Sequence, residues 1–131
     1  MWRRLSMNPK TICGIFGNDE PSLKHALLKR INFNNNGPVV DIFFEVENYP
    51  SIPPIKWMQQ GYNAAQICMK LIEVSSVKLT GWGRNNVVNI ELAKIEDNLI
   101  YLKAEGAGCN IEIAFKWFDV RVTGYLKDTV K

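Results

Sequence analysis

Carboxylates alternate with a phenylalanine along one stretch of the chain, and these side chains are the first candidates for chemistry. Four residues follow a two-residue period that places them on one face of a β-strand: Asp41, Phe43, Glu45 and Glu47. Paired carboxylates could serve general acid–base catalysis in a cleft. On a half-buried strand they more often form a solvated face, and an aromatic side chain among charges is typical of a protein interface. We predict that these residues contact a partner protein; the alternative is that Phe43 packs beneath another element.

A proline-rich segment follows this strand and offers a second candidate surface. Its three prolines stiffen residues 48–63, so presenting aromatic side chains from it costs little ordering entropy on binding. We therefore add Tyr49 and Trp57 to the predicted partner-binding residues. The alternative is that Trp57 and Tyr62 hold the segment against the body of the protein. Because proline disrupts both helices and central strands, we expect an irregular segment here.

The sequence offers little for catalysis or metal binding. It has one histidine, His25, and three widely spaced cysteines, Cys13, Cys68 and Cys109. A zinc site or a Ser-His-Asp arrangement needs several such groups converging on one point. The glycine pairs of the chain lack the flanking residues of a phosphate-binding or dinucleotide-binding loop. We therefore expect reduced cysteines, no catalytic residue, no metal, no cofactor and no enzymatic activity.

The composition describes a folded protein with a modest positive charge. The chain has 131 residues, of which 47% are hydrophobic, and a net charge of +3. This length favours a single domain over residues 1–131, and no apolar run approaches the ~20 residues that span a membrane. The basic residues are dispersed among acidic ones, which does not favour nucleic-acid binding. Arg3 and Arg4 are not followed by the apolar stretch of a secretory signal, so we expect a cytoplasmic protein.

Hydrophobic periodicity predicts one helix followed by a series of strands. Residues 20–30 favour a helix, because Pro21 suits its first position and Lys29 and Arg30 complement the dipole at its end. After the helix, apolar residues alternate as they do in strands, at 31–33, 40–46, 67–74, 77–79, 88–92, 100–104, 111–117 and 120–122. We also expect a bulge near Leu71, and burial of Trp82 at a corner of the sheet and of Trp117 in the core.

The connections between these strands are mostly short, and short connections favour sequential antiparallel pairing. We therefore predict an α+β fold that is mainly β. It is a single-domain antiparallel sheet of about eight strands, either a sandwich or a partly open barrel, with one N-terminal helix covering an end. A homodimer formed through an open sheet edge stays an alternative.

A set of landmarks runs along nearly the whole chain in a fixed order. They are Trp2, Asn8, Ile15-Phe16-Gly17, Pro21-Ser22-Leu23, Lys56-Trp57, Tyr62-Asn63 and Leu79-x-Gly81-Trp82. In this order and spacing, from Trp2 to about Tyr125, the sequence resembles the Immunity protein 50 family of bacterial polymorphic toxin systems. The resemblance implies a small cytoplasmic inhibitor, without catalysis, that binds a cognate toxin protein and occludes its active site. It transfers no catalytic residue to this chain.

Two other functions stay open at this point. A small-ligand-binding or enzymatic β-barrel needs an apolar interior cavity with a few convergent polar groups. A nucleic-acid-binding β domain needs a contiguous basic face. The charge of +3 disfavours an inhibitor that mimics phosphate as a whole. A local acidic patch from Asp41, Glu45 and Glu47 could still act, because exposed charges interact within about 8–10 Å at cellular salt.

Overall fold

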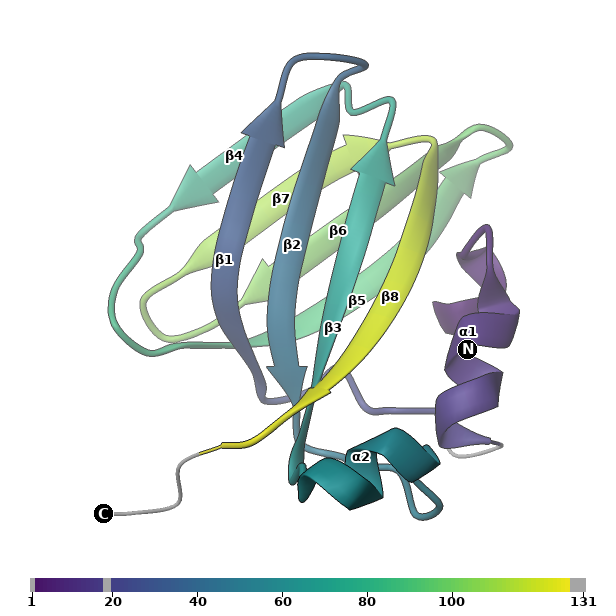
Figure 1. The fold of residues 1–131 in the computed structure, drawn as a ribbon. Helices are drawn as coiled ribbons and strands as arrows, with labels where there is room; N and C mark the ends of the chain where they lie inside the picture. Colours follow the sequence, from purple (N-terminus) through teal and green to yellow (C-terminus); the bar gives the residue numbers. More distant parts are fainter. Residues whose placement is uncertain (1, 18–19, 128–131) are drawn as a thin grey trace.

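The computed structural model describes residues 2–17 and 20–127, and its main feature is one antiparallel sheet of eight strands (Figure 1). The strands are β1 (Ala26–Asn34), β2 (Val39–Val46), β3 (Ala64–Ile72), β4 (Ser76–Thr80), β5 (Asn86–Glu96), β6 (Leu99–Glu105), β7 (Asn110–Phe115) and β8 (Trp117–Tyr125). Their order across the sheet is β4-β7-β6-β5-β1-β2-β3-β8. The predicted mainly β fold with about eight antiparallel strands is confirmed.

The sheet folds over at β5 and so forms two layers. The first three residues of β5, Asn86–Val88, pair with β1, whereas Asn89–Glu96 pair with β6. Figure 1 shows β1, β2, β3 and β8 as a front layer, with β4, β7 and β6 crossing behind it. One strand therefore belongs to both layers, and the apolar faces of the two layers meet as they do in a sandwich.

The hydrophobic core fills the space between the layers. In the front layer Ile42 and Phe44 point inward from β2 and are fully buried. Phe115 and Phe118 are fully buried as well, and their rings meet edge-on with centroids 5.9 Å apart. Burying one such side chain contributes about 1.5–3 kcal/mol to stability. The same alternation directs the residues between them, such as Phe43, to the outer face of the front layer.

The helix predicted over residues 20–30 is wrong, because this segment enters the sheet. Ala26 and Leu28 are buried, and β1 pairs with β2 along its length and with β5 at its start. The local helix signals, a proline at the start and two cations at the end, contribute about 1 kcal/mol or less each. The pairing of β1 with two neighbours and the burial of its apolar residues outweigh them.

Three helical segments lie outside the sheet. The 3-10 helix η1 (Trp2–Leu5) leads into α1 (Pro9–Phe16), which packs beside β8 with Ile12 and Phe16 buried one turn apart (Figure 1). The N-terminal helix of the fold is therefore α1. The segment 48–63, predicted to be irregular, contains α2 (Ile55–Gln60). Its prolines precede the helix, so none of them removes a hydrogen bond from it.

Two predicted core tryptophans are half exposed. Trp82 is 48% exposed, because Gly81 adopts a φ of 77° and turns the chain away from the core. Trp117 is 47% exposed, because the alternation of β7 ends at Phe115 and resumes with Phe118 as the buried residue. In both places a break in the chain's direction reversed the face that the sequence pattern predicted.

The bulge predicted near Leu71 is also wrong. β3 keeps a regular register with β2 and with β8 through Leu71 and Ile72. Glu73, which has a φ of 60°, then turns the chain out of the strand. The register shifts of the described strands lie instead between Leu28 and Arg30 and between Lys94 and Glu96.

Candidate partner-binding site

The six residues predicted to bind a partner lie in three different environments. Asp41 and Phe43 are half-buried on the outer face of β2, which is the face turned away from the core. Glu45, Glu47 and Tyr49 meet around a hollow where β2 ends. Trp57 is buried in the core. The structure thus brings three of the six residues together at one place.

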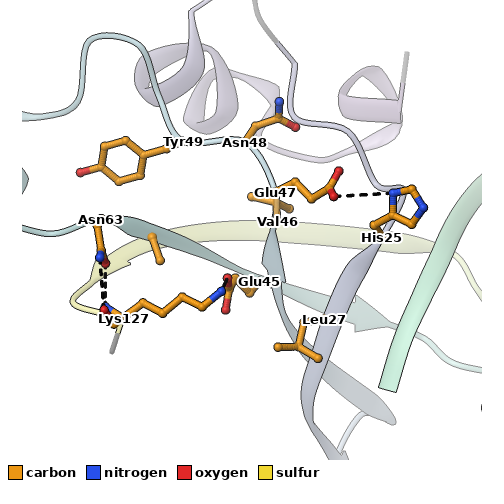
Figure 2. A pocket seen from close by; sticks show the side chains of 10 residues that line it. His25, Leu27, Glu45, Val46, Glu47, Asn48, Tyr49, Asn63 and Lys127 are labelled. Carbon is orange, nitrogen blue, oxygen red and sulfur yellow. Dashed lines mark hydrogen bonds and ion pairs between the residues drawn. The ribbon is translucent and has the colours of Figure 1, made fainter. Parts of the chain in front are cut away.

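This hollow has a volume of about 440 Å³ and opens between the start of β1 and the chain that follows β8 (Figure 2). Its lining includes Leu27, Glu45, Tyr49, Asn63 and Lys127. The hollow is therefore lined mainly by polar side chains.

His25 and Glu47 stand at the mouth of the hollow. The Nδ1 atom of His25 lies 3.6 Å from a carboxylate oxygen of Glu47, and both side chains are more than half exposed. The backbone of His25 has a φ of 55°, and its N–H donates to the Asn89 side chain at 2.9 Å. The tie to β5 holds His25 in a conformation that non-glycine residues rarely adopt. The fold therefore fixes the backbone position from which the imidazole reaches Glu47.

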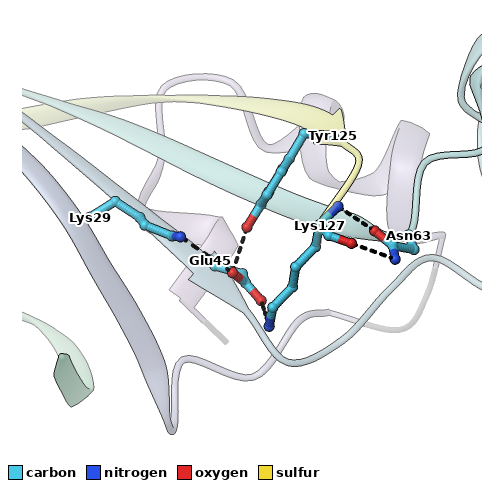
Figure 3. Close-up of polar contacts among 5 residues, drawn as sticks. All are labelled: Lys29, Glu45, Asn63, Tyr125 and Lys127. Atoms are coloured by element: carbon cyan, nitrogen blue, oxygen red, sulfur yellow. Dashed lines mark hydrogen bonds and ion pairs between the residues drawn. The ribbon is translucent and has the colours of Figure 1, made fainter. Parts of the chain in front are cut away.

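Glu45, whose own side chain is buried, is the centre of an ionic cluster on the wall of the hollow (Figure 3). The Tyr125 hydroxyl donates to one carboxylate oxygen at 2.5 Å, and the Lys127 ammonium donates to the other at 2.7 Å. The Lys29 ammonium lies 3.8 Å from the first oxygen. Only 10% of the Glu45 side chain is exposed, so its charge is compensated inside the protein.

The cluster changes the acidity of its members. Burial raises the pKa of Glu45, but the hydrogen bonds from Lys127 and Tyr125 and the charges of Lys127 and Lys29 outweigh burial. The net result is a pKa below the ordinary value of 4.5. Burial, followed by the hydrogen bond to Glu45 and the charge of that residue, raises the pKa of Tyr125. At neutral pH Glu45 is therefore ionised and Tyr125 keeps its proton.

Asn63 fixes the chain that carries Lys127. Its side-chain oxygen accepts a hydrogen bond from the Lys127 N–H at 2.7 Å, and its amide donates to the Lys127 carbonyl at 3.2 Å. The Asn63 N–H also donates to the Tyr125 carbonyl at 3.2 Å. These contacts extend the pairing of β3 with β8 past the end of the strands. They place the Lys127 ammonium over Glu45 (Figure 3).

The remaining outer face of β2 carries charges of both signs. The Arg30 guanidinium lies 4.2 Å from the centre of the Phe43 ring, a cation–π distance. Asp41 stands in register with Lys70, which in turn stands in register with Asp119. One Asp41 oxygen is buried without a hydrogen-bond partner among the described residues. This face is mixed in charge, so the three predicted acids do not form a purely acidic patch.

Tyr49 and Trp57 hold the segment between β2 and β3 in place. Their rings lie 5.9 Å apart, and the Tyr49 hydroxyl donates to the Tyr62 carbonyl at 2.8 Å. A Cβ atom on Gly124 would lie 2.5 Å from the Trp57 indole, so this ring rests directly on the backbone of β8. The edge of Tyr49 still reaches the hollow. Trp57 supports the hollow from the core.

The site holds side chains that can donate and accept hydrogen bonds. Within residues 2–17 and 20–127, no three His, Cys, Asp or Glu side chains gather as a metal site. Burial raises the pKa of the Cys68 and Cys109 thiols, which disfavours the nucleophilic thiolate. The hydrogen-bond donors and acceptors around Glu47 can instead orient a polar group of a partner.

Sequence reasoning gave no site role to His25, nor to the residues that complete the cluster around Glu45, which are Lys29, Asn63, Tyr125 and Lys127. Lys29 was placed in a helix, and Tyr125 and Lys127 lie 80 and 82 residues from Glu45. The Tyr62-Asn63 landmark was the one available signal at these positions, and it carried no indication of a contact with β8. Long-range strand pairing, which brings these residues together, has no local signature.

The fold and the site define a small antiparallel β domain with a polar hollow on one face. The model of the family described as Immunity protein 50 matches residues 8–125, and the chain belongs to this family. No curated protein and no solved structure matches the chain. A family of immunity proteins implies a toxin partner in general and is generally non-enzymatic. Over the residues described, no helix has the length and apolarity to span a bilayer.

Proposed function

We propose that the protein acts in the cytoplasm by binding a cognate bacterial toxin domain and occluding its active site. The observation that carries this proposal is the family match over residues 8–125. The mixed polar hollow beside β2 supports it, because a partner side chain inserted there would meet both donors and acceptors. The inhibitor performs no chemistry in this mechanism; it covers the surface on which the toxin acts.

The docking surface in this proposal runs from the hollow along the outer face of β2. Glu47 and Phe43 supply contacts, because Glu47 is exposed and the Phe43 ring is partly accessible. Asp41 and Tyr49 border them. Glu45 and Trp57 act from behind, where Glu45 positions Lys127 and Trp57 supports Tyr49. The energy of binding would be concentrated in a few such residues.

The other two functions have less support from the geometry. A ligand-binding barrel needs a cavity between the layers, and that space is occupied by fully buried rings such as Phe44 and Phe115. A nucleic-acid-binding domain needs a contiguous basic face, and the outer face of β2 mixes Asp41 and Glu47 with cations.

The test begins with the neighbouring genes. We expect a long upstream reading frame whose C-terminal domain stops growth when expressed alone, and growth that returns when this chain is co-expressed. In a binding titration with that domain in an inactivated form, Glu47→Lys and Phe43→Ala should each raise Kd about ten-fold or more. The matched control is Glu91→Lys, which reverses an exposed charge on β5 in the back layer and should leave Kd unchanged.

Two results would contradict the proposal. If co-expression leaves the toxicity unchanged and no complex forms, the protein does not neutralise that toxin. If the complex forms and Glu47→Lys, Phe43→Ala and Glu91→Lys bind equally well, the toxin docks elsewhere on the protein.

A further inference from the structure

The rest of the chain covers one edge of the sheet and leaves the other edge uncovered. At the β8 edge the Asn8 side chain pairs with the backbone of Val120 through two hydrogen bonds of 2.8 and 3.0 Å, and the Met7 N–H donates to the Phe118 carbonyl at 2.9 Å. At the opposite edge β4 pairs with β7 and with no other strand that the structure describes, and all five of its residues are exposed. An uncovered edge strand is a template for a strand from another chain.

An apolar seam lies between β4 and the second half of β1. Past Leu28, β1 pairs with β2 alone among the described strands, so it leaves one side open toward β4, which lies behind it in Figure 1. Two adjoining hollows of about 450 and 390 Å³ share Phe33, and Val77 lines one while Leu79 and Trp82 line the other. These four side chains are 38–61% exposed. They form a surface that the core does not use.

Trp82 is presented at this seam by a rigid bend. Gly81 has a φ of 77°, and a Cβ atom there would lie 2.0 Å from the Gly108 carbonyl oxygen. Only glycine allows both the turn and this close approach. The bend therefore holds an exposed tryptophan beside Leu79, and little ordering entropy is lost when a partner covers it.

The directions of the β4 side chains predict the side-chain pattern of a strand that would pair with it. Val77 and Leu79 stand in register with the buried Ile113 and Ile111, so they point into the seam, whereas Lys78 points outward. Among residues 2–17 and 20–127, the charged ones that line the two hollows are Lys29 and Arg30, both cations. On β7, Lys78 already stands in register with Glu112. A strand complementary to the free side of β4 has apolar side chains toward the seam and a second acidic side chain next to Lys78.

A second copy of this chain fits the edge less well. Two β4 strands paired about a two-fold axis at their midpoint would place Lys78 directly opposite Lys78 of the other copy. Like charges in that position are destabilising. A single lysine on a short edge strand is also a common device against self-association.

We propose that the toxin docks an extended strand against β4, with apolar side chains in the seam and an acidic side chain facing Lys78. This inference rests on the proposed function, because it assigns the strand to the toxin. The seam lies along the second half of β1, and the hollow at Glu45 lies at the start of the same strand. The partner strand would add a ninth strand to the sheet, as in other cases of strand addition.

The test measures backbone hydrogen exchange and affinity in the complex with the inactivated toxin domain. The amides of residues 76–80 should become at least ten-fold more protected on binding. Lys78→Gln, which removes the charge without placing a second acid opposite Glu112, and Trp82→Ala should each raise Kd about ten-fold or more. Lys94→Gln, the same change at an exposed lysine on β5, should not. Thermal midpoints close to that of the unmodified protein confirm that both variants fold, because both side chains are exposed.

Three outcomes overturn the inference, and they are distinguishable. If the toxin binds but β4 amides stay unprotected and both variants bind normally, the strand addition is wrong while the proposed function stands. If the free protein forms a concentration-dependent dimer with protected β4 amides, the occupant is a second copy. If no toxin binding occurs at all, the proposed function fails and this inference fails with it.

Discussion

The Tyr125 hydroxyl donates a hydrogen bond to the Glu45 carboxylate across 80 residues of sequence, and it joins the last strand to the second. Lys127 completes the contact from the same chain segment at 2.7 Å. The candidate docking hollow therefore has a wall built from two distant parts of the chain. Its shape depends on the ionic cluster as well as on the strands.

Removing the tyrosine hydroxyl tests the contribution of this contact. Tyr125→Phe leaves the buried Glu45 carboxylate with one donor fewer, so we expect a loss of about 1–2 kcal/mol in the free energy of unfolding. Denaturant titration measures it. The matched control is Tyr101→Phe, whose hydroxyl also donates to a carboxylate, that of Glu112, but on the exposed side of the back layer. An equal effect of the two substitutions would show that burial at Glu45 is unimportant.

The lowered pKa of Glu45 predicts a specific acid sensitivity. A carboxyl group with a lower pKa in the folded state stabilises the fold above its unfolded value, near 4.5, and this stabilisation is lost as the pH falls through the folded pKa. The free energy of unfolding should therefore fall as the pH drops below about 4.5. Glu45→Gln should flatten this part of the pH profile. A variant profile that parallels the wild type would exclude Glu45 as the source.

Truncation of Trp57 and of Trp82 should reduce stability by very different amounts. Trp57 is 9% exposed and rests on Gly124, so Trp57→Ala should cost about 3–5 kcal/mol of stability. Trp82 is 48% exposed, so Trp82→Ala should cost less than about 1 kcal/mol. Thermal and denaturant unfolding of both variants check this. A large loss for Trp82→Ala would restore the corner position that the sequence predicted for it.

The protection of the β8 edge from solvent should depend on the side chain of Asn8. Asn8→Ala removes both hydrogen bonds to Val120, so we expect a loss of about 1–2 kcal/mol and faster hydrogen exchange along β8. Asn36→Ala, in the exposed turn between β1 and β2, is the matched control and should change neither. Unchanged exchange at β8 in the Asn8 variant would mean that α1 covers this edge by packing alone.

Much of the fold could be predicted from the sequence, because the alternation of apolar and polar residues in a strand is a local pattern. The alternation from Val40 to Val46 predicted both the buried face of β2 and the outer face that carries Glu45. The same alternation predicted the strands from β4 to β7. The prediction was wrong at residues 20–30. The helix signals there contribute about 1 kcal/mol or less each, and the pairing of β1 with strands on both sides outweighs them.

The site was only half predictable, and the division has a physical reason. Residue types and a two-residue period determined that Asp41, Phe43 and Glu45 share a face, because side-chain direction along a strand is a local property. Only the tertiary structure decided that Tyr125 and Lys127 reach Glu45, that Trp57 lies inside and that Trp82 lies outside. Those facts follow from strand order and from the sense of single turns at positions such as Gly81. They depend on contacts between segments that the chain brings together only when the whole sheet forms.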